Sequence, residues 1–270
     1  MPQSWYEDRV RQLLDGLKAL ERSDEEADAA RRDAEARLEK IRSGSRLKDR
    51  YLWLLVWANG DREVYNRMKP LRDEIKLRRQ QIADIPHRHR TMLAELDDII
   101  TDDLGQNDPE FQALLSEQRG LRRKRDTCDD ALRTISATRG NITSMSSSMP
   151  ISPKGRELAA AEKKTNEITA QVGVVHEKVV KVNGVAGTYG SVSGALVRKL
   201  NTSFLSGEFR YQQRKDELDT ALRTLGEVDR KVRAISGKIE KRLRELDSRR
   251  TRLVKAKRDR LLAAHGIRAT

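Results

Sequence analysis

Apolar residues recur at alternating spacings of three and four positions along most of this chain. One such run covers Tyr6 to Ile41 over five heptads, and another covers Leu218 to Leu253. This spacing gives each helix one apolar stripe, which pairs with the stripe of another helix in a coiled coil. The connections between the runs are short, which favours antiparallel neighbours. The sequence therefore predicts an all-α protein: an elongated helical bundle with antiparallel coiled-coil hairpins and one long C-terminal helix.

The composition agrees with thin helical layers. Apolar residues make up 37% of the 270 residues and charged residues 36%, whereas typical globular chains have roughly 45–50% and 25%. Helices that pack in pairs need fewer apolar residues per unit length than a thick core does. Aromatic residues are only 4% of the chain.

Breaks in the periodicity divide the chain into four predicted parts. Residues 1–135 are predicted to form a bundle of helical hairpins, and residues 136–153, rich in Ser, Gly and Met, a linker or exposed loop. Residues 154–206 are predicted to be a helix followed by a Gly-rich loop. Residues 207–270 are predicted to be one long basic coiled-coil helix that ends at Gly266.

Prolines mark helix boundaries within the first part. Asp108-Pro109-Glu110 is a strong helix start, because Asp is a favoured N-cap and Pro suits the first helical position. Pro70 predicts a kink or a break, and Ile85-Pro86 predicts a helix end. The helices expected here span about 6–42, 46–58, 62–85, 91–104 and 109–135.

The segment 172–197 has two readings. The heptad spacing runs into it without a break, which favours a helix followed by a loop. Asn183-Gly184 within a valine-rich stretch is also a typical hairpin turn, which would give two strands. Its glycines do not form a phosphate loop, because no GK[ST] follows them.

The stretch YLWLLVWANG at 51–60 concentrates the bulky apolar residues, including Trp53 and Trp57. A helix that is apolar on every side is normally buried. The leading interpretation is therefore a central helix of the N-terminal bundle, surrounded by the helices at 6–42, 62–85 and 109–135. An interface with a partner is the second reading, since Trp and Tyr are favoured anchors. Insertion into a membrane surface is the third.

A surface for self-association or for partner helices is predicted on the apolar seams. Asp24, Arg31 and Arg78 interrupt seam positions, as Arg250 does in the last helix, and would set the register. The predicted interface consists of Trp53, Trp57, Leu218, Leu222, Leu225, Val232, Ile235, Ile239 and Leu246.

Positive charge gathers near the end of the chain. The net charge is +13, and residues 208–270 contribute +9 of it from 19 basic and 10 acidic residues. The apolar stripe fades there, so the last turns are expected to leave the coiled coil. A solvated helix face is one reading, and a sequence-independent, salt-sensitive nucleic-acid site is the other. The candidate residues for that site are Arg249, Arg250, Arg252, Lys255, Lys257, Arg258 and Arg260.

Motifs of enzymes are absent from the sequence: it has no P-loop, dinucleotide fingerprint, nucleophile elbow or metal-protease motif. No catalytic residue, cofactor or small-molecule substrate is therefore predicted. His87-x-His89 lacks a third metal ligand, and Arg122–Arg125 is expected to be a solvated helix face. Cys128, the single cysteine, falls on an apolar seam, so we expect a core residue and no disulfide.

No secretory leader or spanning segment is expected, and a single cysteine suits a reducing compartment, so the predicted location is the cytoplasm. The sequence thus favours a non-enzymatic coiled-coil scaffold or assembly protein, forming a homo-oligomer or binding a helical partner. The alternative is a nucleic-acid-binding protein that uses the basic C-terminal helix, and the third reading is membrane-surface binding through Trp53 and Trp57.

Overall fold

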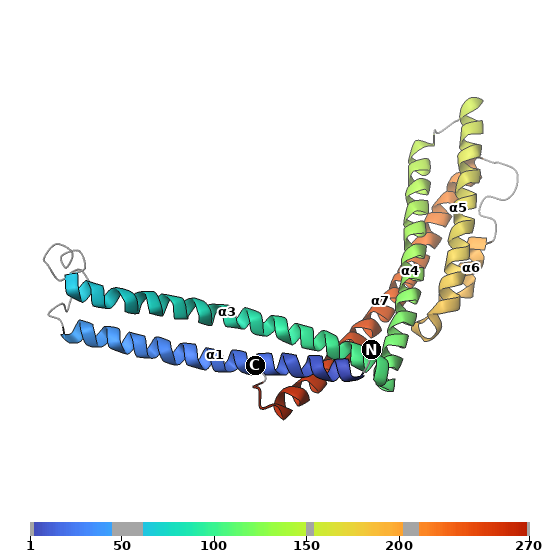
Figure 1. The fold of residues 1–270 in the computed structure, drawn as a ribbon. Helices are drawn as coiled ribbons and strands as arrows, with labels where there is room; N and C mark the ends of the chain where they lie inside the picture. The colour runs from blue at the N-terminus through green and yellow to red at the C-terminus, as the bar shows by residue number, and fades with distance from the viewer. Residues whose placement is uncertain (1–2, 45–61, 150–153, 202–210, 269–270) are drawn as a thin grey trace. The chain divides into compact units, whose positions relative to one another are not determined.

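All regular structure in the described part of the chain is helical. The structure, a computed structural model, describes residues 3–44, 62–149, 154–201 and 211–268. The helices are α1 (Gln3–Gly44), α3 (Arg62–Asn107), α4 (Pro109–Ser148), α5 (Arg156–Ala186), the 3₁₀ turn η2 (Gly187–Tyr189), α6 (Gly194–Asn201) and α7 (Tyr211–Ala264) (Figure 1). The all-α prediction and the long C-terminal helix are confirmed.

The chain divides into two compact units. Unit 1 comprises Met1–Pro109 with Thr251–Thr270, and unit 2 comprises Glu110–Arg250. The helix α7 therefore contributes to both units, and α4 belongs to unit 2. The predicted N-terminal part, 1–135, does not coincide with either unit.

In unit 1, α1 and α3 pack side by side in antiparallel directions (Figure 1). Arg9 of α1 pairs with Glu95 of α3, and Glu35 of α1 pairs with Arg79 of α3 at 3.1 Å, so the numbering falls on one helix as it rises on the other. Most of the predicted seam of α1 is buried, at Val10, Leu13, Leu17, Leu20, Ala27 and Ala34, while Leu38 and Ile41 are half-buried.

The helix α3 continues through both of its prolines. Pro70 and Pro86 lie inside a helix of 46 residues, so the predicted helix end at Pro86 is wrong. Each proline removes one backbone N–H donor from the helix. The effect of this loss is local, and the helix does not end there. The apolar stripe resumes on both sides, with Met68 and Ile75 near Pro70 and Leu96 and Ile100 after Pro86, and their burial holds the chain helical.

In unit 2, α4 runs antiparallel to both α5 and α7. Asp130 and Thr134 of α4 accept hydrogen bonds from Lys178 of α5, at 2.8 and 2.9 Å. Gln118 of α4 donates to Asp247 of α7 at 2.7 Å. The core between these helices is fully buried at Phe111, Cys128, Ile135, Val175, Val179, Leu225 and Ile239.

The segment 136–148 is the last part of α4, and the linker prediction is wrong for these residues. Thr138, Ile142 and Met145 are buried, and they continue the seam from Ile135 at spacings of three, four and three. The serines that suggested a linker lie mainly at exposed positions between these. A polar composition therefore did not prevent an amphipathic helix.

Residues 172–186 belong to α5 and a loop follows them, so the hairpin reading is wrong. Asn183 lies within α5, and its side chain binds the backbone of Val192, accepting from its N–H at 2.7 Å and donating to its C=O at 2.9 Å. This clamp fixes the turn η2 and the loop behind it against α5. The short helix α6 follows, which the sequence did not predict.

The end of α7 stays packed, which corrects the expectation that the last turns leave the coiled coil. Val254, Leu262 and Ile267 are buried within unit 1. The predicted end at Gly266 is confirmed: Gly266 has φ +67°, its N–H binds the C=O of Ala263, and the N–H of Ile267 binds the C=O of Leu262. These two bonds form a Schellman motif.

Trp53, Trp57 and the helix expected at 46–58 lie outside the described residues. The interpretation that this segment packs among 6–42, 62–85 and 109–135 therefore stays a prediction.

Candidate functional site

Ion pairs from both α1 and α7 reach the second half of α3 in unit 1. Residues 91–107 carry five acidic residues and no Lys or Arg, a net charge of −5. The C-terminal residues 251–268 carry six basic residues and one acidic residue, a net charge of +5. Ion pairs join the two segments, so the basic end of the chain lies against a part of α3 whose charge is equal in size and opposite in sign.

Asp103 is the centre of this cluster. It pairs with Lys257 of α7 and accepts a hydrogen bond from Asn107 Nδ2 at 2.8 Å. The ammonium group of Lys257 also lies 5.7 Å from the ring centroid of Tyr6 in α1. One lysine therefore connects α7 with both other helices of unit 1.

The environment shifts the pKa values of these groups in opposite directions. Burial alone would raise the pKa of Asp103, but the hydrogen bonds from Lys257 and Asn107 outweigh it, and its pKa is lowered. Burial raises the pKa of Tyr6, although the nearby charge of Lys257 acts against it. At neutral pH Asp103 is thus an anion and Tyr6 a neutral phenol.

A second ion pair lies one and a half turns earlier on α3. Arg258 Nη1 lies 2.8 Å from Asp97 Oδ2, while the other carboxylate oxygen of Asp97 is buried and has no hydrogen-bond partner among the described residues. Burial raises the pKa of Asp97, and Arg258 only partly offsets this effect. Arg9 of α1 pairs with Glu95 on the same stretch of α3.

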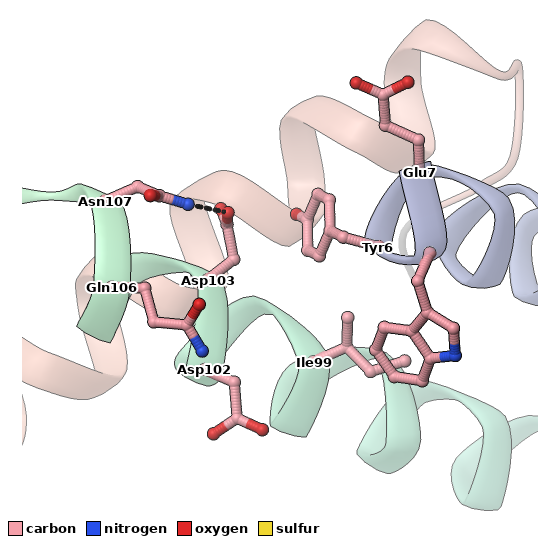
Figure 2. Close-up of a pocket in the computed structure, with 8 residues that line it drawn as sticks. Tyr6, Glu7, Ile99, Asp102, Asp103, Gln106 and Asn107 are labelled. Atoms are coloured by element: carbon pink, nitrogen blue, oxygen red, sulfur yellow. Dashed lines mark hydrogen bonds between the residues drawn. The ribbon is translucent and has the colours of Figure 1, made fainter. Parts of the chain in front are cut away.

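A pocket of about 480 Å³ opens beside this cluster, between the start of α1 and the end of α3. Figure 2 shows Tyr6 and Asp103 pointing toward each other across it, with the bond from Asn107 to Asp103 drawn as a dashed line. Its lining residues are Trp5, Tyr6, Glu7, Ile99, Asp102, Asp103, Gln106 and Asn107.

The groups of this cluster are held by one another. The phenol of Tyr6 stays protonated at neutral pH because its pKa is raised, and the Asp103 carboxylate is held by a lysine and an amide. A nucleophile activated by a neighbouring base is not among the residues that line this pocket. The cluster therefore fixes α7 to α1 and α3.

Three of the seven residues of the predicted basic site form ion pairs within the chain. Lys257 and Arg258 pair with Asp103 and Asp97, and Arg249 pairs with Glu110 within unit 2 at 2.5 Å. Arg250 is half-buried, while Arg252, Lys255 and Arg260 are exposed. The sequence showed the basic run but not its acidic counterpart on α3, although 91–107 contains no basic residue to neutralise its own charge.

The predicted interface on α7 is filled by the chain itself. Leu222 is half-buried, and the other six seam residues are buried in the core of unit 2: Leu218, Leu225, Val232, Ile235, Ile239 and Leu246. This seam is thus not an exposed surface, because the apolar stripe packs against other helices of the same chain.

Three further groups were singled out in the sequence: Cys128, the pair His87 and His89, and the run Arg122–Arg125. Cys128 is fully buried, as expected of a core residue, and burial raises the pKa of its thiol. His87 is exposed and His89 half-buried, and no group of three His, Cys, Asp or Glu side chains in the described ranges could hold a metal ion. In the run Arg122–Arg125, the first two residues are exposed and the last two are half-buried.

No helix within the described part of the chain combines the length and the apolar character needed to cross a membrane. Comparisons with known protein families, with curated proteins and with solved structures found no match to this chain.

Proposed function

We propose that this chain is a non-enzymatic coiled-coil protein that assembles with protein partners, and that its α1–α3 hairpin is the part that meets them. The observation that carries the proposal is a contrast in burial along the seams. In unit 2 the seams are covered by neighbouring helices, and Val175, Val179 and Ile239 have no exposed surface. Toward the end of the hairpin, the seam residues Leu38, Ile41, Leu71 and Ile82 are only half-buried.

The cause of this contrast is the number of helices available. The end of α7 reaches α1 at Lys18, whose ammonium group donates to the C=O of His265 at 3.4 Å, and at Glu21, which accepts from the N–H of Arg268 at 3.0 Å. Arg268 also pairs with Glu25 of α1 at 3.5 Å. Further along α1, Glu35 pairs with Arg79 of α3 at 3.1 Å. A two-helix layer leaves the flanks of its seam open, and a further helix can cover them.

Trp53 and Trp57 remain in the proposal on sequence grounds. They lie between α1 and α3 in the sequence, in the segment 45–61. Trp is enriched among the residues that dominate interface energies. We propose the cytoplasm as the location, since one cysteine suits a reducing compartment.

Size-exclusion chromatography with light scattering, at low and at high salt, tests self-assembly. An oligomer whose mass is the same at both salts supports assembly through apolar contacts, and the double variant Trp53→Ala/Trp57→Ala should reduce that mass. A wild-type monomer at both salts excludes self-assembly as the function.

The second candidate is sequence-independent binding of nucleic acid. It is favoured by the basic first half of α3, where residues 65–90 carry eight basic and three acidic residues. Binding of a labelled duplex should then fall steeply as salt rises. The charge-reversal variant Lys255→Glu/Arg260→Glu distinguishes the basic half of α3 from the basic end of α7, since Lys255 and Arg260 are both exposed on α7. Liposome binding that is lost in the Trp53/Trp57 variant would support the third candidate, a membrane surface.

A further inference from the structure

The pocket between the start of α1 and the end of α3 has an inner side that already holds a cation. The ammonium group of Lys257 lies 5.7 Å from the ring centroid of Tyr6 and pairs with Asp103. Tyr6 and Asp103 both line the pocket, whose volume of about 480 Å³ falls within the usual range for ligand pockets, roughly 300–1,000 Å³. The inner side therefore shows how this pocket holds an ammonium group, with an aromatic ring and a carboxylate.

The preceding residue on each helix repeats this pair of chemical groups. Trp5 precedes Tyr6 on α1, Asp102 precedes Asp103 on α3, and both line the same pocket. Trp5 is 47% exposed, and Asp102 is exposed as well. Among the described residues, the carboxylate of Asp102 has no cationic partner, whereas that of Asp103 pairs with Lys257. The outer side of the pocket thus offers a second aromatic ring and a second carboxylate to a ligand.

An aliphatic side chain completes this outer side. Ile99 lines the pocket and lies three residues before Asp102 on α3, so the two are neighbours on one face of the helix. Figure 2 shows Ile99 and Asp102 on one side of Tyr6 and Glu7 on the other. Trp5 and Ile99 therefore provide apolar walls at the side of the pocket that carries Asp102.

The charge of the pocket selects a cation. Glu7, Asp102 and Asp103 line it, and no Lys, Arg or His is among its lining residues. Lys257 balances one of these three carboxylates, so the lining keeps a net charge of −2. A divalent metal ion needs several oxygen ligands, and no three acidic side chains in the described ranges are grouped to hold one. The apolar walls suit a cation that is carried on an apolar stem.

We propose that the outer side of this pocket binds a lysine side chain of a partner protein, whose stem lies on Trp5 and Ile99 and whose ammonium group meets the carboxylate of Asp102. Lysine carries a compact charge on a flexible stem, and the face of an indole attracts its ammonium group. The proposal rests on the proposed function, because it names the chemistry of one contact that a protein partner makes. It assigns that contact to the end of the hairpin where α1 begins and α3 ends.

The test titrates Nα-acetyl-lysine N-methylamide, which carries the lysine side chain without a charged backbone, into the isotope-labelled full-length protein. The chain has three tryptophans, and the variant Trp5→Phe identifies the indole N–H signal of Trp5 in the NMR spectrum. That signal should shift in a saturable manner. The same compound acetylated at Nε keeps the stem but loses the charge, so it should bind at least fivefold more weakly.

Matched variants locate the site. Asp102→Asn keeps the size of the side chain and removes its charge, and it should weaken binding of the lysine compound about three- to fivefold. Asp98→Asn makes the same change at an exposed position of α3 outside the pocket, and it should alter the affinity less than about 1.5-fold. Both substitutions lie at exposed positions, and circular dichroism checks that each variant keeps its helices.

Three results would overturn the proposal. An unchanged Trp5 signal would mean that the pocket does not bind lysine. Equal weakening by Asp102→Asn and Asp98→Asn would mean that only the net charge of α3 attracts the compound. A shift caused by spermidine but not by the lysine compound would assign the pocket to a free polyamine. An oligomer in light scattering together with an unchanged Trp5 signal would retain the proposed function and refute this site alone.

Discussion

Replacing Lys257 by alanine should destabilise unit 1 much more than replacing Arg249 destabilises unit 2, although both residues form ion pairs on α7. The side chains of Lys257 and Asp103 are 34% and 14% exposed, whereas those of Arg249 and Glu110 are 57% and 58% exposed. Loss of Lys257 leaves a carboxylate with little access to water and no cationic partner among the contacts described above, although Asn107 still donates to it. Hydrogen bonds to charged groups contribute about 1.5–3 kcal/mol, and we expect a loss of about 2 kcal/mol here after allowing for the partial exposure of Lys257. Exposed pairs such as Arg249 with Glu110 contribute about 0.2–1 kcal/mol.

Hydrogen exchange measured by mass spectrometry suits this comparison, because it reports each segment separately. Global denaturation of a protein with two units is not a single two-state transition. A loss of 2 kcal/mol corresponds to roughly 30-fold faster exchange. We expect this in Lys257→Ala for peptides covering 91–107 and 251–268, with peptides of unit 2 unchanged. In Arg249→Ala the exchange near the start of α4 should rise less than about fivefold.

The dependence on pH gives an independent check that the ion pair of Asp103 with Lys257 stabilises unit 1. The pKa of Asp103 is lowered in the folded state, so the stabilisation is fully present above the pKa of the unfolded carboxyl, about 4. It is lost as the pH falls through the folded pKa, because the folded state must then take up the proton. The difference between wild type and Lys257→Ala should therefore shrink below pH of about 4. Equal effects of the two alanine variants at pH 7, or a difference that grows in acid, would refute this reasoning.

Three further changes test the packing of unit 2 and the end of α7. Ile142→Asn places an amide at a fully buried position and should cost about 3–5 kcal/mol, seen as faster exchange throughout α4; a cost within about 0.5 kcal/mol would indicate an exposed linker after all. Asn183→Ala removes both hydrogen bonds to the backbone of Val192 and should cost about 2 kcal/mol, with proteolysis of the loop at 187–193 as the readout. Gly266→Ala puts a side chain at φ +67° and should cost about 1 kcal/mol, so that the exchange of the last turn of α7 rises severalfold while α4 is unchanged.

The heptad spacing was sufficient to predict the helices and most of their buried faces. Leu13 and Leu17 in α1, Val175 and Val179 in α5 and Leu225 and Ile239 in α7 all lie in the core. A stripe of this period can be buried only on one face of a helix, so the pattern determines both the element and its inward side.

The errors arose where composition was allowed to outweigh the spacing. The serines of 136–148 suggested a linker, yet Thr138, Ile142 and Met145 continue the stripe of Ile135. Pro86 suggested a helix end, yet one missing donor in a helix of 46 residues is outweighed by the packing on either side. The periodicity was the better guide in both places.

The partners of charged residues could not be predicted, because a sequence does not state which helices become neighbours. The basic run from Arg249 to Arg260 looks available until α7 is placed beside α3. The sequence did contain one relevant signal, an acidic stretch at 91–107 without any basic residue, which indicates a partner of opposite charge. Complementary runs of this kind are best considered together.

Unit 2 is inserted in the sequence between the two parts of unit 1, and this order has a consequence for synthesis on the ribosome. The acidic half of α3 is made before residue 110, but its basic counterpart follows only after the 141 residues of unit 2. At about 5–20 residues per second, that delay is roughly 7–28 s. During this time α1 and α3 can form their hairpin, while Asp97 and Asp103 remain without Arg258 and Lys257. Unit 2 can therefore fold before unit 1 is complete, and the last turns of α7 close the structure as the final step.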